Sequence, residues 1–409
     1  MINLICEVLV VIAIYLLFKE YLVTLKGCKL KLKRRKGPFK FAVLIPARDE
    51  SLVIEGLLDS LEGQTVKVDN ADIYIIVESD KDKTVSIAKK RGMNIVYRKD
   101  LTKRRKGYAL DDAIKEILLA NKHYDAYFIF DADNVIDKNF IKEMTKSYQK
   151  GYDIGIGYRN TKNGNSSVCA AASSLTFSMI NTLGNDYKGK HNLSLTVSGT
   201  GFYIAGDILE KLGGYPFNSL TEDYEVSLYA VINNLSSVYN KKAKYFDEQP
   251  VNYKVSVMQR TRWVKGYFET RAKYYEKLFV ATKSKGDNYA SCYTTLVGVM
   301  PYILLVISVL LYTLNLIYRI ITNLIVSFLV FPLVWQLLLI ILFIYIGLVL
   351  FTLLLLIKEK NSLKLNRKIK IKVLFYNPFF LISYVKCLYL AIKNKNLSWE
   401  RIVHNSKME

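Results

Sequence analysis

The sequence predicts an α/β fold, in which a doubly wound and mostly parallel β-sheet lies between apolar segments at the two ends of the chain. Three observations predict it. Short β-branched runs alternate with helix-period runs through the first 130 residues. Polar side chains follow these strand-like runs, where open α/β sheets bind their ligands. Long stretches that are poor in charge occur at both ends of the chain.

The alternation justifies each element of the sheet region in turn. Runs rich in Val, Ile, Phe and Tyr have the length of buried strands, and the segments between them have helical spacing. The expected elements are a strand at 41–45, a helix at 50–61, a strand at 73–77, a helix at 84–91, a strand at 94–97, a helix at 108–120 and a strand at 126–130.

Composition narrows the class of protein. The chain has 409 residues, is 51% hydrophobic, and carries 58 Lys and Arg against 36 Asp and Glu, a formal charge of +22. These values exclude fibrous, disordered and small disulfide-rich proteins. The cysteines are widely spaced and form no CxxC pair, which indicates reduced thiols rather than a zinc site. The five cysteines are Cys6, Cys28, Cys169, Cys292 and Cys387.

The first apolar segment, 2–18, has about the minimum length of a spanning helix, and a basic run at 26–40 follows it. A signal peptide normally carries its positive charge before the apolar core. We therefore expect an uncleaved transmembrane anchor at 1–25. By the positive-inside rule, a cytoplasmic domain at 26–285 follows, with the chain in the cell membrane.

The second apolar region suits two transmembrane helices within 286–357, since both of its flanks are basic and the number of crossings must then be even. The last segment, 358–409, is expected to be a basic loop, an interfacial or re-entrant helix at 373–392 and a basic tail. The alternative is a fourth ordinary crossing with an external tail.

Polar residues follow three of the expected strands. The first is followed by residues 46–50 (PARDE) and the second by residues 78–84 (ESDKDKT); either alone is more often a capped turn than a site. The strand at 126–130 is followed by Asp131-Ala132-Asp133. Two carboxylates at i and i+2 on a tight turn can face one divalent ion, which the pyrophosphate of a sugar nucleotide would also ligate.

Two further motifs have both a plain and a functional interpretation. The basic run 99–107 is either a solvated loop or a diphosphate cradle, with Lys106 and Gly107 at a helix amino terminus that favours anions. Thr221-Glu222-Asp223 follows a Gly-rich segment, and its carboxylates would act as a base or as a helix cap. The order of all these motifs is more specific than any one of them.

The last motif, Gln259 to Trp263, lies in an Arg- and aromatic-rich helix expected at 255–279. A basic amphipathic helix is typical of a membrane surface. With the segment 171–183, which is also expected at the interface, it would supplement the few spanning helices.

The ordered set resembles the inverting family 2 glycosyltransferases, and more narrowly the processive, membrane-embedded branch with cellulose, chitin and hyaluronan synthases. The D, DxD, TED and QxxRW series of that branch matches this sequence between 39 and 263. The resemblance implies a GT-A fold and an inverting, metal-dependent hexosyltransferase. Glu78 stands where the family usually has an Asp that contacts uracil. The Glu side chain is longer by one methylene, which is a departure from the pattern.

The resemblance also implies a role for each matching residue. Asp223 would be the catalytic base, Asp131 and Asp133 would hold Mg²⁺ or Mn²⁺, and Trp263 would stack on the acceptor sugar. Thr200 and Gly201 would line the acceptor cleft beside it. The donor-binding residues implied are Pro46, Ala47, Arg48, Glu50, Glu78, Lys106, Asp131, Gln259 and Arg262.

The favoured function is polymerisation of a UDP-sugar, with UDP-glucose as the best guess, into a β-linked polysaccharide such as a cellulose-like or mixed-linkage β-glucan that crosses the membrane. Three helices are barely enough to line a channel. The interfacial helices or a homodimer would therefore have to contribute.

Two alternatives stay open. One is a non-processive transferase that adds a sugar to a lipid acceptor, and the other is a non-catalytic membrane scaffold. Partners would be the UDP-sugar, the growing chain and the lipid bilayer. Nucleic acid is not expected, because the main basic runs flank apolar segments.

Overall fold

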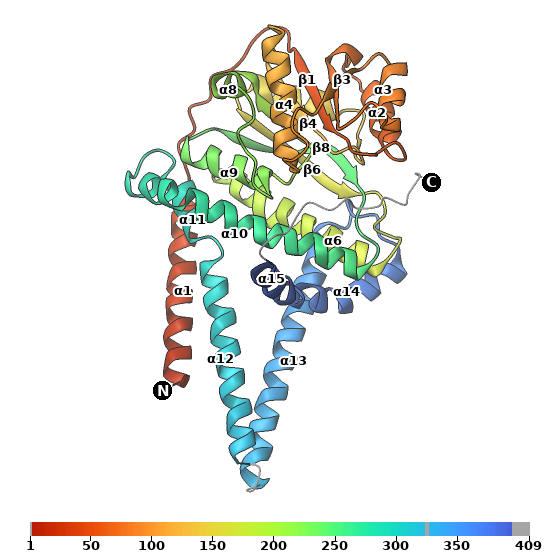
Figure 1. Ribbon diagram of the computed structural model, residues 1–409. Helices are drawn as coiled ribbons and strands as arrows, with labels where there is room; N and C mark the ends of the chain where they lie inside the picture. Colours follow the sequence, from red (N-terminus) through yellow and green to blue (C-terminus); the bar gives the residue numbers. More distant parts are fainter. Residues whose placement is uncertain (1, 324–326, 395–409) are drawn as a thin grey trace.

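The computed structural model describes residues 2–323 and 327–394. One mixed sheet forms the centre of the upper body in Figure 1, with strand order β3-β2-β1-β4-β7-β6-β8-β5. Four of its seven strand pairs are parallel, so the predicted mostly parallel α/β sheet is confirmed. The strands are β1 Phe41–Pro46, β2 Ile73–Val77, β3 Asn94–Tyr97, β4 Ala126–Ile129, β5 Val135–Ile136, β6 Ile154–Thr161, β7 Phe202–Ala205 and β8 Ser237–Asp247.

Both faces of the sheet are covered, because alternate side chains of a strand point to opposite sides. In β1, Val43 and Ile45 pack into one core with α2, α3 and α5, whereas Ala42 and Leu44 pack into a second core with α4, α8 and α9. This two-sided burial explains why β1 reads as a continuous apolar run. The helices are α2 Ile54–Glu62, α3 Lys83–Lys90, α4 Lys106–Leu119, α5 Phe140–Gln149, α8 Gly206–Leu212 and α9 Glu222–Ile232.

The expected elements of the first 130 residues all form, with shifts at their ends. The helix expected at 50–61 begins at Ile54, because residues 51–53 form a turn after β1. The helix expected at 108–120 begins at Lys106, so Lys106 and Gly107 lie in its first turn. A glycine is required there, since a Cβ at Gly107 would come within 1.8 Å of the Phe217 carbonyl oxygen.

A layer of helices lies below the sheet and runs across the direction of the long apolar helices (Figure 1). It includes both segments expected at the interface, 171–183 and 255–279. The first forms α6 and then a π-helix, and the second forms the 31-residue α10. The layer consists of α6 Val168–Met179, the π-helix Ile180–Asp186, α7 Tyr187–Lys190, α10 Tyr253–Lys283, α11 Tyr289–Val297, α14 Arg367–Ile382 and α15 Tyr384–Lys393.

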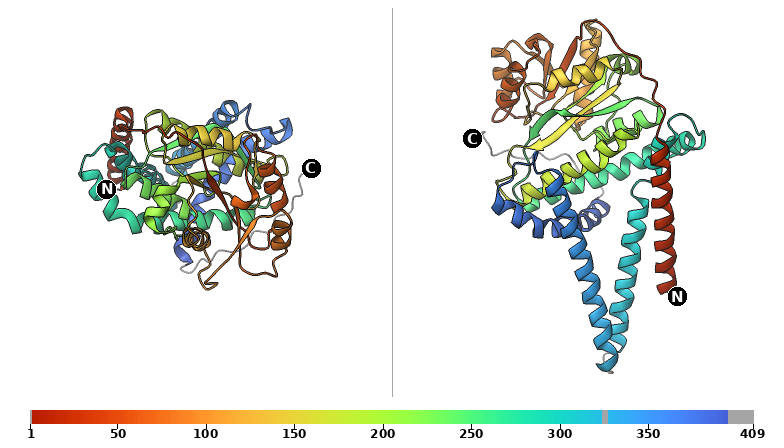
Figure 2. Two further views of the ribbon diagram at one scale, coloured as in Figure 1. Left: turned by 90° about the horizontal axis from the view of Figure 1, so that it is seen from above. Right: turned by 180° about the vertical axis from the view of Figure 1, so that it is seen from behind.

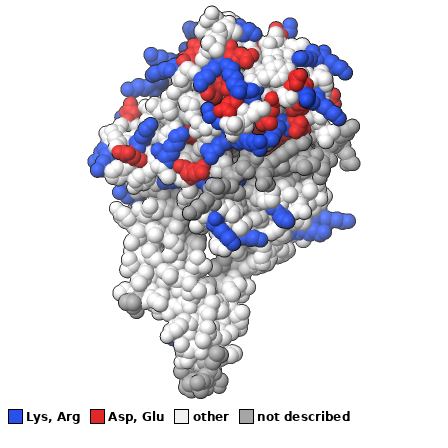
Figure 3. Space-filling model, viewed as in Figure 1, with Lys and Arg blue, Asp and Glu red and all other residues white. Residues whose placement is uncertain are grey.

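Three long apolar helices extend away from this layer: α1 Ile2–Lys26, α12 Met300–Thr322 and α13 Ser327–Lys358. α1 packs along α12, where the Ser308 hydroxyl donates to the Cys6 carbonyl oxygen at 3.0 Å. α12 and α13 converge at the end farthest from the sheet (Figure 2). Charged side chains gather on the sheet body and are sparse on these helices (Figure 3), as expected for helices in lipid.

In the described part of the chain, four helical segments are long and apolar enough to cross a membrane: Ile2–Lys26, Tyr289–Thr322, Val330–Lys358 and Arg367–Lys393. The chain is therefore a membrane protein. The fourth segment is α14 and α15, which lie crosswise beneath α10 in both views. An interfacial place for residues 373–392 stays a prediction, and the basic tail from residue 395 onward lies outside the described residues.

Candidate active site

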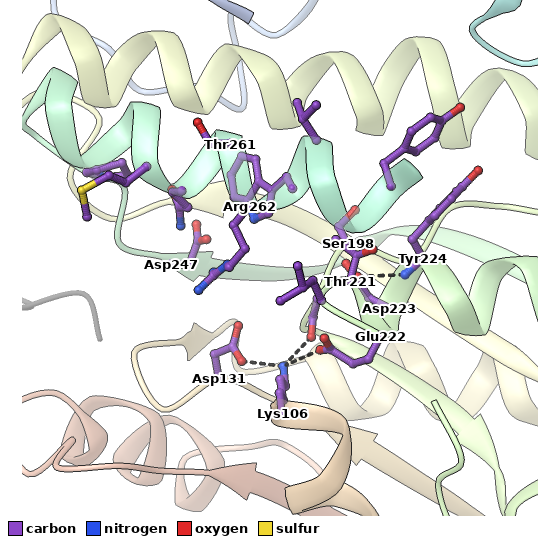
Figure 4. A pocket seen from close by; sticks show the side chains of 18 of the residues that line it. Lys106, Asp131, Ser198, Thr221, Glu222, Asp223, Tyr224, Asp247, Thr261 and Arg262 are labelled. Carbon is purple, nitrogen blue, oxygen red and sulfur yellow. Dashed lines mark hydrogen bonds and ion pairs between the residues drawn. The ribbon is translucent and has the colours of Figure 1, made fainter. Parts of the chain in front are cut away.

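A cleft of 1660 Å³ lies between the carboxyl ends of β1, β2 and β4, the start of α9, and α10 (Figure 4). Most of the residues singled out from the sequence line it, although they come from six separate segments. They are Pro46, Ala47, Arg48, Glu50, Glu78, Lys106, Asp131, Asp133, Asp223, Gln259, Arg262 and Trp263. The open sheet explains this convergence, because parallel strands deliver the residues that follow them to one edge.

Thr200 and Gly201 are placed differently from the expectation. They lie behind the wall of the cleft, and the residues that line it are Ser198 and Gly199. The Asp131 backbone N–H donates to the Thr200 hydroxyl at 2.8 Å, and that hydroxyl is bonded in turn to Asn134. Thr200 therefore holds the turn of the DxD motif.

Lys106 is the central cation of the cleft. Its Nζ donates to Asp131 Oδ1 at 2.5 Å and to the Gly199 carbonyl oxygen at 2.6 Å, and lies 3.9 Å from Glu222 Oε1 (Figure 4). Burial alone would lower the pKa of Lys106, but the carboxylates of Asp131 and Glu222 outweigh burial and raise it. The ammonium group thus stays charged and neutralises the acidic side chains around it.

The two carboxyl groups at the start of α9 are shifted in the same direction. Burial raises the pKa of Glu222 to about 8, with the attraction of Lys106 opposing the shift. Burial also raises the pKa of Asp223, while its own hydrogen bond from the Tyr224 backbone N–H lowers it. Both shifts have the same sign, so each carboxyl group takes up a proton more readily than an exposed carboxyl group does.

Two cations face the cleft from other elements. Arg262, on α10, points down into the cleft toward Lys106 and Asp131 (Figure 4). Burial lowers the pKa of Arg262 from its usual value, and Glu222 and Asp131 oppose that shift. At the opposite rim, Arg48 Nε pairs with Glu78 Oε2 at 3.2 Å. Basic side chains therefore lie among the acidic ones in the cleft, and they suit an anionic ligand such as a nucleoside diphosphate.

Reasoning from the sequence missed one ion pair on the wall, the half-buried Arg159 with the buried Asp247. Arg159 Nε, from β6, donates to Asp247 Oδ2 at 2.9 Å, and Nη1 donates to the Ser198 carbonyl oxygen at 2.6 Å. The same guanidinium lies 3.6 Å from the centre of the Phe177 ring, which packs edge-on against Trp263 at 5.6 Å. No local motif marks these residues, because three distant segments meet at Arg159.

Asp131 and Asp133 fit a divalent cation that arrives together with a diphosphate. Asp131 is partly exposed to the cleft, and Asp133 accepts hydrogen bonds from Asn134 and from the Glu248 backbone N–H. Among the described residues, no group of three His, Cys, Asp or Glu side chains could hold a metal ion alone. Mg²⁺ and Mn²⁺ are commonly held by one or two carboxylates together with substrate phosphates, as this donor set requires.

Comparisons with known proteins agree with this geometry. Residues 38–266 match the family model described as "Glycosyltransferase like family 2". The "Probable glycosyltransferase YdaM" of Bacillus subtilis (strain 168) is 26% identical over 245 residues, 56% of this chain and 55% of that protein. The chain thus spans about half the length of this curated relative.

A solved structure shares the fold. The mannosyltransferase PcManGT from Pyrobaculum calidifontis, in complex with GDP-Man and Mn²⁺, superposes with a TM-score of 0.56 at 12% identity, over 95% of this chain and 99% of that one. At this identity the similarity establishes the fold alone, a GT-A-like sheet with long apolar helices.

Proposed function

The chain belongs to the family 2 glycosyltransferases, and from this premise we propose that it transfers a hexose from a UDP-sugar with inversion at the anomeric carbon. The observation that supports this most directly is the meeting of Lys106, Asp131, Asp223 and Arg262 in one cleft at the carboxyl edge of the sheet. Inverting transfer is a single in-line displacement, so it needs one base and cations on the leaving group, and no enzyme nucleophile.

Each of these residues has one task in the proposed mechanism. Asp223 takes the proton from the attacking hydroxyl, a contribution of about 10²- to 10⁴-fold in rate. Arg262 and Lys106 bind the diphosphate and balance the charge that develops on it as the glycosidic bond breaks. Asp131 and Asp133 would hold Mg²⁺ or Mn²⁺, which when bound supplies further charge stabilisation to the leaving diphosphate.

We further propose that the product is a β-linked polysaccharide, with UDP-glucose as the donor. The cleft volume of 1660 Å³ exceeds the range of about 300–1000 Å³ that is usual for one small ligand, which leaves room for an acceptor chain. Trp263 and Phe177 line the same cleft on the side of α10 and α6. The growing polysaccharide would be exported along α12 and α13. The crosswise helices or a second copy of the protein would complete the path.

A second candidate acceptor is a lipid hydroxyl at the membrane surface, and a specific observation favours it. The end of the cleft nearest the long helices is lined by apolar residues at α12 and α15, among them Val299, Ile303 and Leu388. All three side chains are partly exposed there. An acceptor with an apolar chain would find a matching surface at this end. In either case the catalytic domain would face the cytoplasm.

A donor screen on the purified full chain in detergent tests both proposals. We expect UDP release from one UDP-hexose in the presence of Mn²⁺ or Mg²⁺, and loss of that release when EDTA removes the metal. GDP-mannose is the comparison donor. Failure of every nucleotide sugar to react would return the chain to the scaffold interpretation. A glycosidase-sensitive polymer supports polymerisation, whereas one lipid-soluble product supports the lipid acceptor.

A further inference from the structure

Arg260, on α10, is a charged side chain that is only 1% exposed. Its Nη1 donates to the Phe380 carbonyl oxygen at 3.0 Å and to the Ser383 hydroxyl at 2.8 Å, and its guanidinium lies 3.9 Å from the centre of the Phe380 ring. None of its hydrogen-bond partners among the described residues is a carboxylate. Burial of a cation without a counter-ion is costly, so we expect these contacts to hold the guanidinium in one position at the junction of α14 with α15.

Arg271, further along α10, makes the same kind of contact with another helix. Its Nη1 donates to the Thr295 carbonyl oxygen and its Nη2 to the Leu296 carbonyl oxygen, both at 2.6 Å. These carbonyl groups lie in the last turn of α11, as that of Phe380 lies in the last turn of α14. Carbonyl groups in a last turn lack helical partners and carry the negative end of the helix dipole, so they attract a guanidinium. α10 is therefore held at two points by the carboxyl ends of two other helices.

Helical spacing places both arginines on the side of α10 that faces away from Arg262. Successive residues of an α-helix are turned by about 100°, and positions 260 and 271 are about three turns apart, which leaves them within about 20° of each other. Arg262 is turned by about 160° from Arg260 and by about 180° from Arg271. The side chain of Arg262 points into the cleft (Figure 4). Two guanidinium groups on one side of α10 thus hold the helix while a third reaches the cleft from the other side.

The side of α10 that carries Arg262 packs closely against the start of α9. A Cβ at Gly266 would come within 2.5 Å of Thr221 Cγ2, and Thr270 Oγ1 lies 3.3 Å from Thr221 Oγ1. Gly266 is turned by only about 40° from Arg262, so it belongs to the same side of the helix. A rotation of α10 about its own axis would therefore disturb its contact with α9 and the direction of Arg262 together.

From this arrangement we propose that Arg260 and Arg271 are positioning residues, which fix the rotation of α10 about its axis and so place Arg262 and Trp263 in the cleft. The proposal rests on the proposed function of Arg262 in glycosyl transfer and adds the residues that position it. Arg260 does not line the cleft, although residues 259 and 261 on either side of it do. The carboxyl ends of α11 and α14 thus set the geometry of the cleft from the far side of α10.

Arg260→Met tests the proposal in the full chain in detergent, because it removes the hydrogen bonds and keeps an apolar side chain. We expect kcat for UDP release from the UDP-sugar to fall about 10-fold, since a displaced Arg262 balances the charge on the leaving diphosphate less well. Arg91→Met is the matched control, because Arg91 pairs with Asp59 and Glu62 outside the cleft. It should keep the kcat of the parent chain.

A second background separates positioning from a general loss of folded protein. In Arg262→Lys, the guanidinium that Arg260 positions is gone, so adding Arg260→Met should lower kcat less than about 2-fold further. A general loss of stability would lower kcat about 10-fold in both backgrounds, because independent effects multiply. Equal losses in the two backgrounds would overturn the proposal.

Trp263 reports the position of α10 without any turnover. It becomes the only indole of the chain when the other two tryptophans are replaced by phenylalanine. These are Trp335 and Trp399. A rotation of α10 changes the surroundings of Trp263, so we expect its fluorescence emission maximum to shift in Arg260→Met and in Arg271→Met, and to stay unchanged in Arg91→Met. An unshifted emission in both folded arginine variants would overturn the proposal.

Ser383→Ala provides a milder route if Arg260→Met does not fold, because it leaves α10 itself unaltered. It removes one of the two oxygens that Arg260 Nη1 binds, so it should shift the Trp263 emission in the same direction and lower kcat about 2- to 5-fold. Ser86→Ala is its control, since the Ser86 hydroxyl donates to a carbonyl oxygen of its own helix, α3. A parent chain that releases no UDP from any donor would overturn the proposed function, whereas an unshifted Trp263 emission in Ser383→Ala would overturn the positioning, so the two failures are distinguishable.

Discussion

The two ends of the cleft differ in how their polar side chains are paired. At the end where we propose that the donor binds, the donor end, charged side chains are already paired with one another: Lys106 with Asp131 at 2.5 Å, and Arg48 with Glu78 at 3.2 Å. At the acceptor end, Gln249 carries an unpaired oxygen among the described residues, and Trp263 is half-buried. We therefore expect a charged donor to exchange partners with the existing ion pairs, and a neutral acceptor to bind at the other end without such an exchange.

This difference has a physical cause. Acidic groups that lie close together repel one another when ionised, so Lys106 stabilises the donor end before substrate arrives. An unpaired amide oxygen costs much less, and the acceptor end can tolerate it. We therefore expect substitutions at the donor end to change binding of the nucleotide, and substitutions at the acceptor end to change transfer without changing nucleotide binding.

The largest effect is expected at the junction of the two ends, at Asp223. Asp223→Asn removes the proton acceptor and should lower the rate of transfer about 10²- to 10⁴-fold. UDP affinity, measured by calorimetry, should remain nearly that of the parent chain. Unaltered turnover in this variant would remove Asp223 from the mechanism.

A smaller effect is expected from Lys106→Met at the donor end. Loss of charge-assisted hydrogen bonds to the diphosphate should raise the KM for the UDP-sugar about 10- to 100-fold. Lys115→Met is the matched control, because Lys115 lies on the same helix and pairs with Asp111. Equal KM values for the two variants would show that Lys106 is a structural counter-ion and not a donor ligand.

At the acceptor end, Trp263→Ala should impair transfer to the acceptor more than it impairs handling of the donor. Removal of the indole should lower transfer about 3- to 10-fold, while hydrolysis of the donor without acceptor changes less. Trp335, which is exposed on α13, supplies the control substitution. Equal loss of transfer and of hydrolysis would place Trp263 with the donor residues and erase the contrast between the two ends.

The smallest effect is expected from Glu222→Gln at neutral pH. The pKa of Glu222 is raised to about 8 by burial, so the parent side chain is already largely protonated at pH 7 and glutamine resembles that form. Raising the pH through 8 ionises Glu222 and adds negative charge beside Lys106, which should slow the parent enzyme. The variant cannot ionise, so its rate should not fall in that range. Parallel pH–rate profiles would contradict this assignment.

Much of the fold could be predicted, because its signals are local. β1 and β2 each read as apolar runs whose side chains are buried on both faces of the sheet, and Lys106 lies in the basic run 99–107 at the start of a helix. The order of the strands could not be predicted in the same way. β7 pairs antiparallel with both β4 and β6, and the partners Ile129 and Phe202 are far apart in the chain, so no local pattern indicates their pairing.

The candidate site divides in the same way. The residues proposed for the donor end, and Asp223, were singled out from their order along the chain. Lys106 meets Asp131 because both come after parallel strands, β3 and β4, at the same edge of the sheet. On the wall formed by β6, α6 and the end of β8, only Trp263 nearby was singled out from the sequence. Arg159, Phe177 and Gln249 carry no motif, and they come together only through contacts between β6, α6 and the end of β8.

The amino-acid order alone was enough for the alternation of strands and helices, the apolar segments and the charged residues at strand ends, since each of these depends on periodicity and neighbours within a few residues. The three-dimensional fold decided which of those residues share a cleft, that Thr200 supports the turn and does not line the wall, and that Arg159 joins Phe177 and Trp263 to Asp247. Contacts between distant segments depend on how the layers pack, and packing is a property of the whole chain.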